Sequence, residues 1–247
     1  MGSVFRALLA AAGFSLAAAS GAAPADAPLR AVASFSILGD IVREVGGDDV
    51  SVATLVGPDG DAHEYEPTPS DAKQLSAARV LFVNGLDFET WMPRLAKSAG
   101  FSGLTVVASQ GVAPRKFAGP REEHDHDHDH DHGHDHDDDA GHDHDHHHGD
   151  LDPHAWQDLS NGVIYARNVA EGLAAADPAR APAYRQRAQA YIARLQELDA
   201  ETRKTFAAIP AERRKVVTSH DAFGYFGDAY GVDFIAAMGV STDAEPS

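Results

Sequence analysis

Residues 29–56 form the stretch LRAVASFSILGDIVREVGGDDVSVATLV, which determines the fold that we expect. Leu29–Ser34 is an apolar run of strand length, and Ile37–Val45 has apolar residues at helical spacing. Gly46-Gly47 then stops the helix, and Val50–Val56 is rich in the β-branched residues typical of a strand. A strand, a helix and a second strand in succession predict two parallel strands joined by a crossover helix.

The same alternation of strands and helices continues along the chain. The sequence Thr68-Pro69-Ser70-Asp71 predicts a helix start, with Thr68 as the cap, Pro69 at the first helical position and Asp71 reaching back. Further strands are expected at Val80–Asn84, Leu104–Ala108, Lys215–Ser219 and Asp233–Ala237, and further helices at Phe88–Ala99, Leu159–Ala175, Ala183–Phe206 and Phe223–Tyr230. This order predicts an α/β layer fold with parallel sheets.

The longest expected helix is Ala183–Phe206, whose apolar residues form one stripe at helical spacing. At 1.5 Å per residue it would measure about 36 Å, the width of a small domain. Its polar face is wide for a core helix, so we expect it to run along two lobes and to join them. Residues 215–237 begin a second α/β unit, and Ser241–Ser247 resembles the entry to a further helix, so this unit is expected to be incomplete.

The first residues predict an export signal. Arg6 supplies a short positive region, Ala7–Ala19 is apolar, and small residues follow from Ser20 to Ala25. The alternative is a membrane anchor, but the apolar run is shorter than the ~20 residues that span a bilayer. Because the chain has no Cys to acylate, we expect a soluble, periplasmic mature protein that is neither lipidated nor stably inserted in a membrane.

The composition narrows the classes of function. A chain of 247 residues is long enough for one large domain or two modest ones. Without Cys it has no disulfides or thiolate sites, so a transition-metal site must use His, carboxylate or water. Residues 122–150 hold 13 of the 38 acidic residues and no Lys or Arg. The rest of the chain has a formal net charge of −5 and no stripe of basic residues, so no nucleic-acid partner is expected.

A low-complexity insert at residues 119–150 alternates imidazole with carboxylate, most densely in HDHDHDHDHGHDHDDDAGHDHDHHHGD at residues 124–150. With almost no apolar residue it has nothing to bury, so we expect a disordered loop. We interpret it as a collector of several weakly held metal ions, because an acidic linker would not need twelve His and an affinity tag would be terminal. The expected weak ligands are His124, His126, His128, His130, His132, His134, His136, His142, His144, His146, His147 and His148.

Three His lie outside the insert: His63 in a loop after a predicted strand, His154 just before a helix, and His220 directly after a strand. An isolated His is most often a hydrogen-bonded core or surface residue. In open α/β sheets, however, ligands bind beyond the carboxyl ends of strands, so all three can converge on one crevice. Three imidazoles and an oxygen ligand suit an ion with tetrahedral coordination, and zinc is the ion that this ligand set favours most. The acids near enough in sequence to orient the rings are Asp61, Glu64, Asp152 and Asp221.

The segments around these His resemble the zinc-uptake members of the metal-binding class of ABC-transporter solute-binding proteins. The matching segments are HEYEPTPSD at 63–71, DLDPHAWQDLSNG at 150–162, VVTSHDAFGYFGDAYGV at 216–232 and GVSTDAEPS at 239–247. The resemblance extends from about Leu29 to Ser247, and the four segments follow the family's order. It implies a periplasmic protein that binds Zn2+, delivers it to a membrane permease with a cytoplasmic ATPase, and catalyses nothing.

The resemblance also implies two Rossmann-like α/β lobes with parallel sheets, joined by a long rigid helix and holding the metal between them. His63, His154 and His220 fall on three of the family's ligand positions. Manganese-type relatives usually have a carboxylate at the position of His220, so His220 favours zinc, and a His/Asp-rich loop also belongs to the zinc members. The expected signal peptide, N-terminal lobe, linking helix and start of the C-terminal lobe are residues 1–25, 26–178, 179–208 and 209–247.

Two departures from the family pattern affect the expected site. Ala62 stands where many relatives have Pro before the first ligand, which is expected to alter that loop. The family also continues beyond residues 239–247 to an acidic metal ligand, so we expect the sequence to be a fragment, with water or a carboxylate such as Glu64 as the alternative fourth ligand. The full-length protein is expected to be a monomer.

Three other functions are compatible with parts of the sequence. The same fold and role for manganese or iron is one, because nitrogen-rich sites also bind other transition metals. A periplasmic metal buffer acting through the His-rich loop is another, and it predicts several weak sites instead of one tight site. A zinc hydrolase is the third, but the chain has no HExxH, nucleophile elbow or phosphate loop, so we expect no enzyme activity and no catalytic residue.

Overall fold

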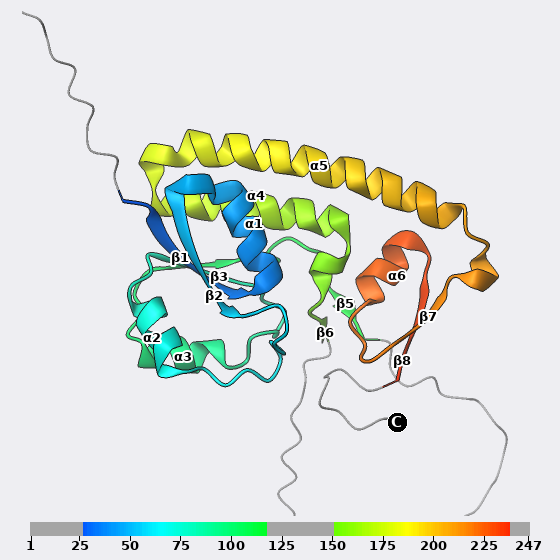
Figure 1. The fold of residues 1–247 in the computed structure, drawn as a ribbon, viewed down its shortest axis with the longest axis horizontal. Helices are drawn as coiled ribbons and strands as arrows, with labels where there is room; N and C mark the ends of the chain where they lie inside the picture. The colour runs from blue at the N-terminus through cyan, green and yellow to red at the C-terminus, as the bar shows by residue number, and fades with distance from the viewer. Residues whose placement is uncertain (1–26, 118–150, 238–247) are drawn as a thin grey trace, which may run out of the picture.

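The computed structural model describes residues 27–117 and 151–237 (Figure 1). Its larger sheet has four parallel strands in the order β2-β1-β3-β4. The strands are β1 (Leu29–Phe35), β2 (Val50–Val56), β3 (Val80–Val83) and β4 (Leu104–Val107). β3 is buried along its whole length and β1 at all but one position, as expected of central strands covered on both faces. The sheet is therefore the centre of the hydrophobic core.

Helices cover both faces of this sheet. On one face α1 (Ser36–Gly46) packs against α4 (Leu159–Ala176), and α5 (Ala181–Ala207) lies over both; α2 (Pro69–Ser76) and α3 (Met92–Ser98) lie on the other face (Figure 1). Short 3-10 helices span Gly47–Asp49, Ala155–Gln157, Pro178–Arg180 and Ala211–Arg213. Among the described helices, none combines the length and apolar character needed to cross a bilayer.

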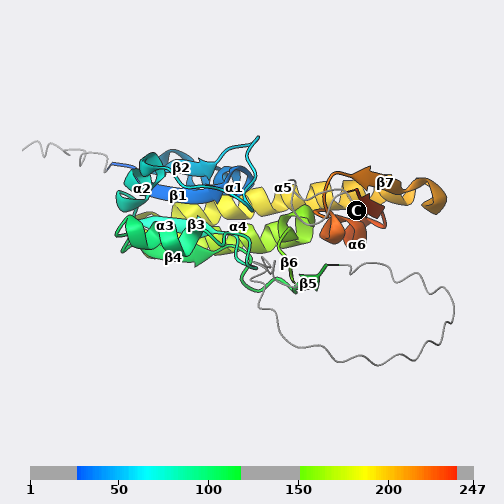
Figure 2. The ribbon, with the colours of Figure 1, turned by 90° about the horizontal axis from the view of Figure 1, so that it is seen from below.

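A second sheet consists of two parallel strands, β7 (Lys215–Thr218) and β8 (Asp233–Ala236), connected by α6 (Gly224–Tyr230). The long helix α5 runs past the first sheet and reaches this second one (Figures 1 and 2). The predicted fold class is thus confirmed: the protein is α/β, with parallel strands and one long helix.

Polar contacts attach α5 at both of its ends. Near its start, the Arg187 guanidinium donates to the carbonyl oxygens of Val45 and Gly46 at the end of α1. Near its end, Arg203 donates to the carbonyl oxygen of Ala229 in α6. α5 packs against α1 and α4, which cover the first sheet, and against α6, which connects the strands of the second.

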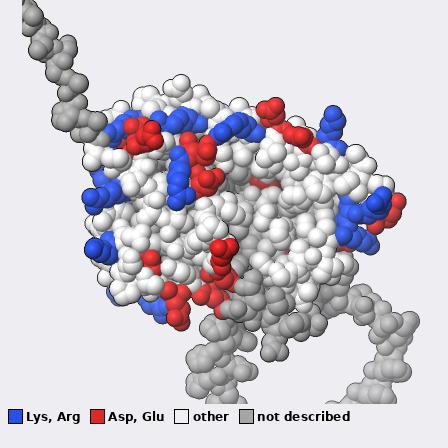
Figure 3. Space-filling model, in the orientation of Figure 1, with Lys and Arg blue, Asp and Glu red and all other residues white. Residues whose placement is uncertain are grey.

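On the face drawn in Figure 3, basic and acidic side chains are interspersed, and no large patch has a single sign of charge.

Most predicted elements agree with the structure to within one or two residues, and the predicted helix start at Thr68 is confirmed in detail. Asp71 donates its backbone N–H to the Thr68 hydroxyl, and the Asp71 carboxylate accepts the Thr68 backbone N–H, which is a complete capping box. The same carboxylate accepts a hydrogen bond from the Tyr65 hydroxyl at 2.9 Å. This network anchors the loop that contains His63.

The prediction of a helix from Phe88 is wrong, because α3 begins only at Met92. The preceding residues form a turn in which the Glu89 carboxylate accepts the Ser34 hydroxyl and the backbone N–H of Asn84. Burial raises the pKa of this carboxyl, although the hydrogen bonds oppose the shift. Helical periodicity in the sequence could not show that Glu89 is needed for a buried polar cluster.

A short antiparallel pair was not anticipated from the sequence. β5 (Arg115–Lys116) pairs with β6 (Leu151–Asp152), so the chain on either side of residues 118–150 is brought together. The expected insert at 119–150, the signal peptide at 1–25 and the segment 241–247 lie outside the described residues.

Candidate metal centre

The structure brings together the three His that lie outside the insert. His63 follows β2, His154 follows β6, and His220 follows β7, so each lies beyond the carboxyl end of a strand. One possible ligand nitrogen from each ring lies within 4.8 Å of the others. The Nε2 atoms of His63 and His154 are 3.0 Å apart. Two nitrogens bound to one zinc ion at 2.0–2.1 Å would lie roughly 3.3 Å apart, so this spacing suits a shared ion.

His154 is the most firmly oriented of the three. It is 2% exposed, and its Nδ1 lies 2.8 Å from Oδ1 of Asp152, which is itself fully buried. The same oxygen accepts the backbone N–H of His154. A carboxylate that accepts the Nδ1 proton leaves Nε2 with a free lone pair, which is the arrangement found at metal-binding imidazoles. The expectation that Asp152 orients a ring is matched by this contact.

His63 is held by its loop. The Asp61 carboxylate accepts the backbone N–H of His63 at 2.8 Å, and the Trp91 indole N–H donates to the carbonyl oxygen of Ala62 at 2.9 Å. The imidazole of His63 packs edge-on against Phe88, with ring centroids 4.8 Å apart. Ala62, the residue before His63, is therefore fixed by a hydrogen bond from Trp91.

His220 is partly buried beside the other two rings. Its carbonyl oxygen accepts the Thr218 hydroxyl and the backbone N–H of Ala222, which form a tight turn after β7. Burial lowers the pKa of the His220 imidazole, and the neighbouring His154 lowers it further, against the opposite influence of Asp61 and Asp221. A lower pKa favours the neutral imidazole, which is the form that binds a metal.

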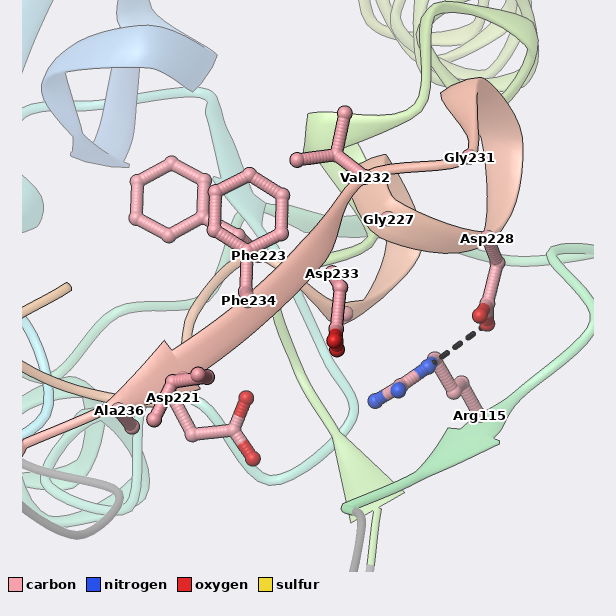
Figure 4. Close-up of a pocket in the computed structure, with 12 residues that line it drawn as sticks. Arg115, Asp221, Phe223, Gly227, Asp228, Gly231, Val232, Asp233, Phe234 and Ala236 are labelled. Carbon is pink, nitrogen blue, oxygen red and sulfur yellow. Dashed lines mark hydrogen bonds and ion pairs between the residues drawn. The ribbon is translucent and has the colours of Figure 1, made fainter. Parts of the chain in front are cut away.

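Asp221 and Glu64, the other acids expected near the site, are not placed beside one of the three His rings as Asp152 is. Asp221 lines a neighbouring cavity together with Arg115, as Figure 4 shows. Glu64, considered above as a fourth ligand, is exposed and does not belong to the three-histidine group. The twelve His of the insert, from His124 to His148, lie outside the described residues.

The three imidazoles line a cavity of about 230 Å³. Its other walls include the aromatic residues Phe35, Phe88, Trp156 and Phe223 and the polar residues Ser36, Asp61 and Gln157. This volume is below the range of about 300–1,000 Å³ typical of pockets for small organic molecules. The space is sufficient for a single ion with few additional ligands.

Two groups near this centre were not identified from the sequence. Arg115 ion-pairs with Asp152, the partner of His154, at 3.0 Å. Asn84 donates to the carbonyl oxygen of Pro153, next to His154, at 2.9 Å, and accepts a hydrogen bond from Tyr165. Arg115 and Asn84 are far from His154 in the sequence and belong to no motif, so no local signal could identify them.

Residues 31–247 match a family described as zinc-uptake complex component A, periplasmic. Among curated proteins, the chain is 34% identical over 223 residues to a manganese ABC transporter substrate-binding lipoprotein of Streptococcus pneumoniae, covering 88% of this chain and 64% of that protein. It is 36% identical over 217 residues to a manganese-binding lipoprotein of Halalkalibacterium halodurans, covering 88% and 63%. The chain thus spans a little under two thirds of the length of these relatives.

Solved structures show the same fold. The periplasmic zinc-binding protein TroA of Treponema pallidum superposes with a TM-score of 0.72 at 30% identity, covering 89% of this chain and 70% of that one. The Zn(II)-bound AdcA of Streptococcus pneumoniae gives a TM-score of 0.67 at 26% identity, covering 89% and 41%. The relatives are thus named for different metals, manganese among the curated proteins and zinc in these two structures.

Proposed function

Because this chain belongs to the zinc-uptake component A family of periplasmic metal-binding proteins of ABC transporters, we propose that it captures Zn2+ and delivers it to an ABC-type import permease with its ATPase. The ligands that we propose are His63, His154 and His220. We also propose that residues 1–25 direct export to the periplasm, and that residues 179–208 link two lobes formed by residues 26–178 and 209–247.

The observation that supports this proposal most strongly is the convergence of three imidazoles from three separate strand ends on one small cavity. A set of three nitrogen ligands favours zinc, whereas carboxylates, carbonyls and water suit manganese. The curated relatives named for manganese or iron support the alternative that this protein serves one of those ions. His220 is the residue that favours zinc, since manganese-type relatives usually have a carboxylate at its position.

A transport role fits the site better than catalysis. The family is one of substrate-binding transport proteins. We further propose that residues 122–150 act as a weak metal collector for this site; a buffer acting through the insert alone is the alternative.

The choice of metal can be tested with the substitution His220→Glu. We expect the unmodified protein to bind zinc more tightly than manganese, in the order of intrinsic affinities for nitrogen ligands. His220→Glu replaces a nitrogen ligand by a hard oxygen and should shift the zinc-to-manganese affinity ratio towards manganese by at least about tenfold, or 1.4 kcal/mol. Competition titrations against a chromophoric chelator measure both affinities.

The control is His142→Glu, the same chemical change within the insert, which should leave the ratio for the tight site unchanged. Equal affinities of the unmodified protein for zinc and manganese would contradict the assignment to zinc. The role in metal capture would stand in that case, because it depends on tight binding and not on the choice of ion.

A further inference from the structure

Arg115 connects strand β6, which precedes His154, with helix α6, which follows His220. It lies in β5, and its guanidinium donates through Nη1 to Oδ2 of Asp152 at 3.0 Å and through Nε to Oδ2 of Asp228 at 2.8 Å. Figure 4 shows the second contact, in which the side chain reaches from β5 to α6. The backbone N–H of Arg115 also donates to the Tyr225 hydroxyl of α6 at 2.8 Å. Arg115 thus contacts β6 and α6 at the same time.

These contacts connect Arg115 with His154 and with the helix that follows His220. Asp152 accepts Arg115 on one carboxylate oxygen and the Nδ1 of His154 on the other. Helix α6, which supplies Asp228, begins four residues after His220. A chain of hydrogen bonds therefore leads from Asp228 of α6, through Arg115 and Asp152, to the ring of His154.

The first residue of α6 provides independent support for a specific fit around Arg115. A Cβ atom added to Gly224 would lie 2.0 Å from Nη1 of Arg115 and 2.7 Å from Oδ2 of Asp152. Any side chain at this position would collide with the ion pair. The backbone of Gly224 is not in the left-handed region, so conformational freedom does not explain the glycine. The close approach of α6 to the Arg115–Asp152 pair does explain it.

We propose that Arg115 is a positioning residue for the metal site. It fixes the position of Asp152, and through Asp152 that of the His154 ring, relative to α6. This inference rests on the proposed function, because it assigns Arg115 to the same three-histidine site. Asp152 is fully buried, so loss of Arg115 leaves one of its oxygens without the cation that it contacts. The carboxylate is then free to turn, and the Nδ1 proton of His154 loses a fixed acceptor.

The substitution Arg115→Gln tests this role. We expect zinc affinity to fall by roughly tenfold, at the lower end of the 10- to 100-fold effect of losing a direct partner of a ligand. Arg115→Lys keeps the positive charge, so its loss of zinc affinity should be smaller than that of Arg115→Gln. Some loss should remain, because Lys cannot bridge two carboxylates as Arg does. Arg185→Gln is the matched control, since it removes an exposed arginine that pairs with Glu171, and it should leave the affinity unchanged.

A readout beyond affinity separates positioning from general stability. In the metal-free protein, ¹⁵N chemical shifts should show His154 protonated at Nδ1, and Arg115→Gln should move these shifts towards a mixture of the two tautomers. A purely structural ion pair would lower the unfolding temperature without changing the tautomer. Unchanged ¹⁵N shifts together with wild-type zinc affinity in folded Arg115→Gln would overturn the inference.

Gly224→Ala gives a second route that keeps Arg115 in the chain. The added methyl group should displace the guanidinium and weaken zinc binding, and the loss in the double variant Arg115→Gln/Gly224→Ala should be smaller than the product of the two single losses. Fully multiplicative losses would show that the two residues act separately and would contradict the inference. Absence of a tight zinc site in the unmodified protein would instead contradict the proposed function.

Discussion

Replacing His154 by Ala is expected to weaken zinc binding by about 100- to 1,000-fold. Binding free energies of about 10–16 kcal/mol for structural zinc correspond to roughly 3 kcal/mol for each of four ligands, and 1.4 kcal/mol is a factor of ten. His154 is the most buried of the three proposed ligands, and its removal also leaves Asp152 without the ring to which it is hydrogen-bonded. We therefore expect the largest single-residue effect at this position.

Competition with a fluorescent zinc chelator measures this loss for His154→Ala, with His63→Ala and His220→Ala in parallel. His142→Ala, the same change within the insert, should leave the tight affinity unaltered. Wild-type affinity in His154→Ala would show that the three-histidine cluster is a set of packed core imidazoles and not the metal site.

Lowering the pH from 7.5 to 5.5 is expected to weaken zinc binding by about 100-fold. Zinc binds the neutral imidazole, so affinity is greatest above the imidazole pKa and is lost as the pH falls through it. An imidazole with the ordinary pKa near 6.5 is only about one-tenth neutral at pH 5.5, so each ligand that titrates in this range costs about tenfold.

The lowered pKa of His220 reduces its share of this loss. Because burial and the neighbouring His154 favour its neutral form, His220 remains able to bind at a pH where an ordinary imidazole is protonated. The measurement is a series of zinc titrations between pH 7.5 and 5.5 on protein that lacks residues 122–150, so that the twelve insert His do not contribute. Constant affinity over this range would exclude imidazole ligation.

Local sequence patterns predicted the parts of the fold that depend on local physics. The apolar pattern of residues 29–56 predicted β1, α1 and β2, because β1 is buried at all but one position and α1 buries one face. The four residues from Thr68 to Asp71 predicted a capping box that the structure contains in full. The start of α3 was missed because Glu89 forms hydrogen bonds with Ser34 and Asn84, which tertiary packing alone brings near.

The three His of the candidate site were predictable from the sequence, but the residues that position them were only partly so. The rule that ligands lie beyond the carboxyl ends of strands suggested that His63, His154 and His220 converge, and the structure places them together, although the strand before His154 was not predicted. Arg115 was not predictable, because a two-residue strand has no periodicity and its partner Asp152 lies beyond the insert. Contacts that join distant segments of the chain through single side chains leave no local pattern.

The proposed three-histidine zinc site is tested most directly by calorimetric zinc titration of the protein with and without residues 122–150. We expect one tight site that persists when the insert is removed and that is strongly weakened in His220→Ala, with additional weak sites present only when the insert is retained. If all zinc binding were lost with the insert, the three-histidine site would be wrong, and the protein would be a metal buffer.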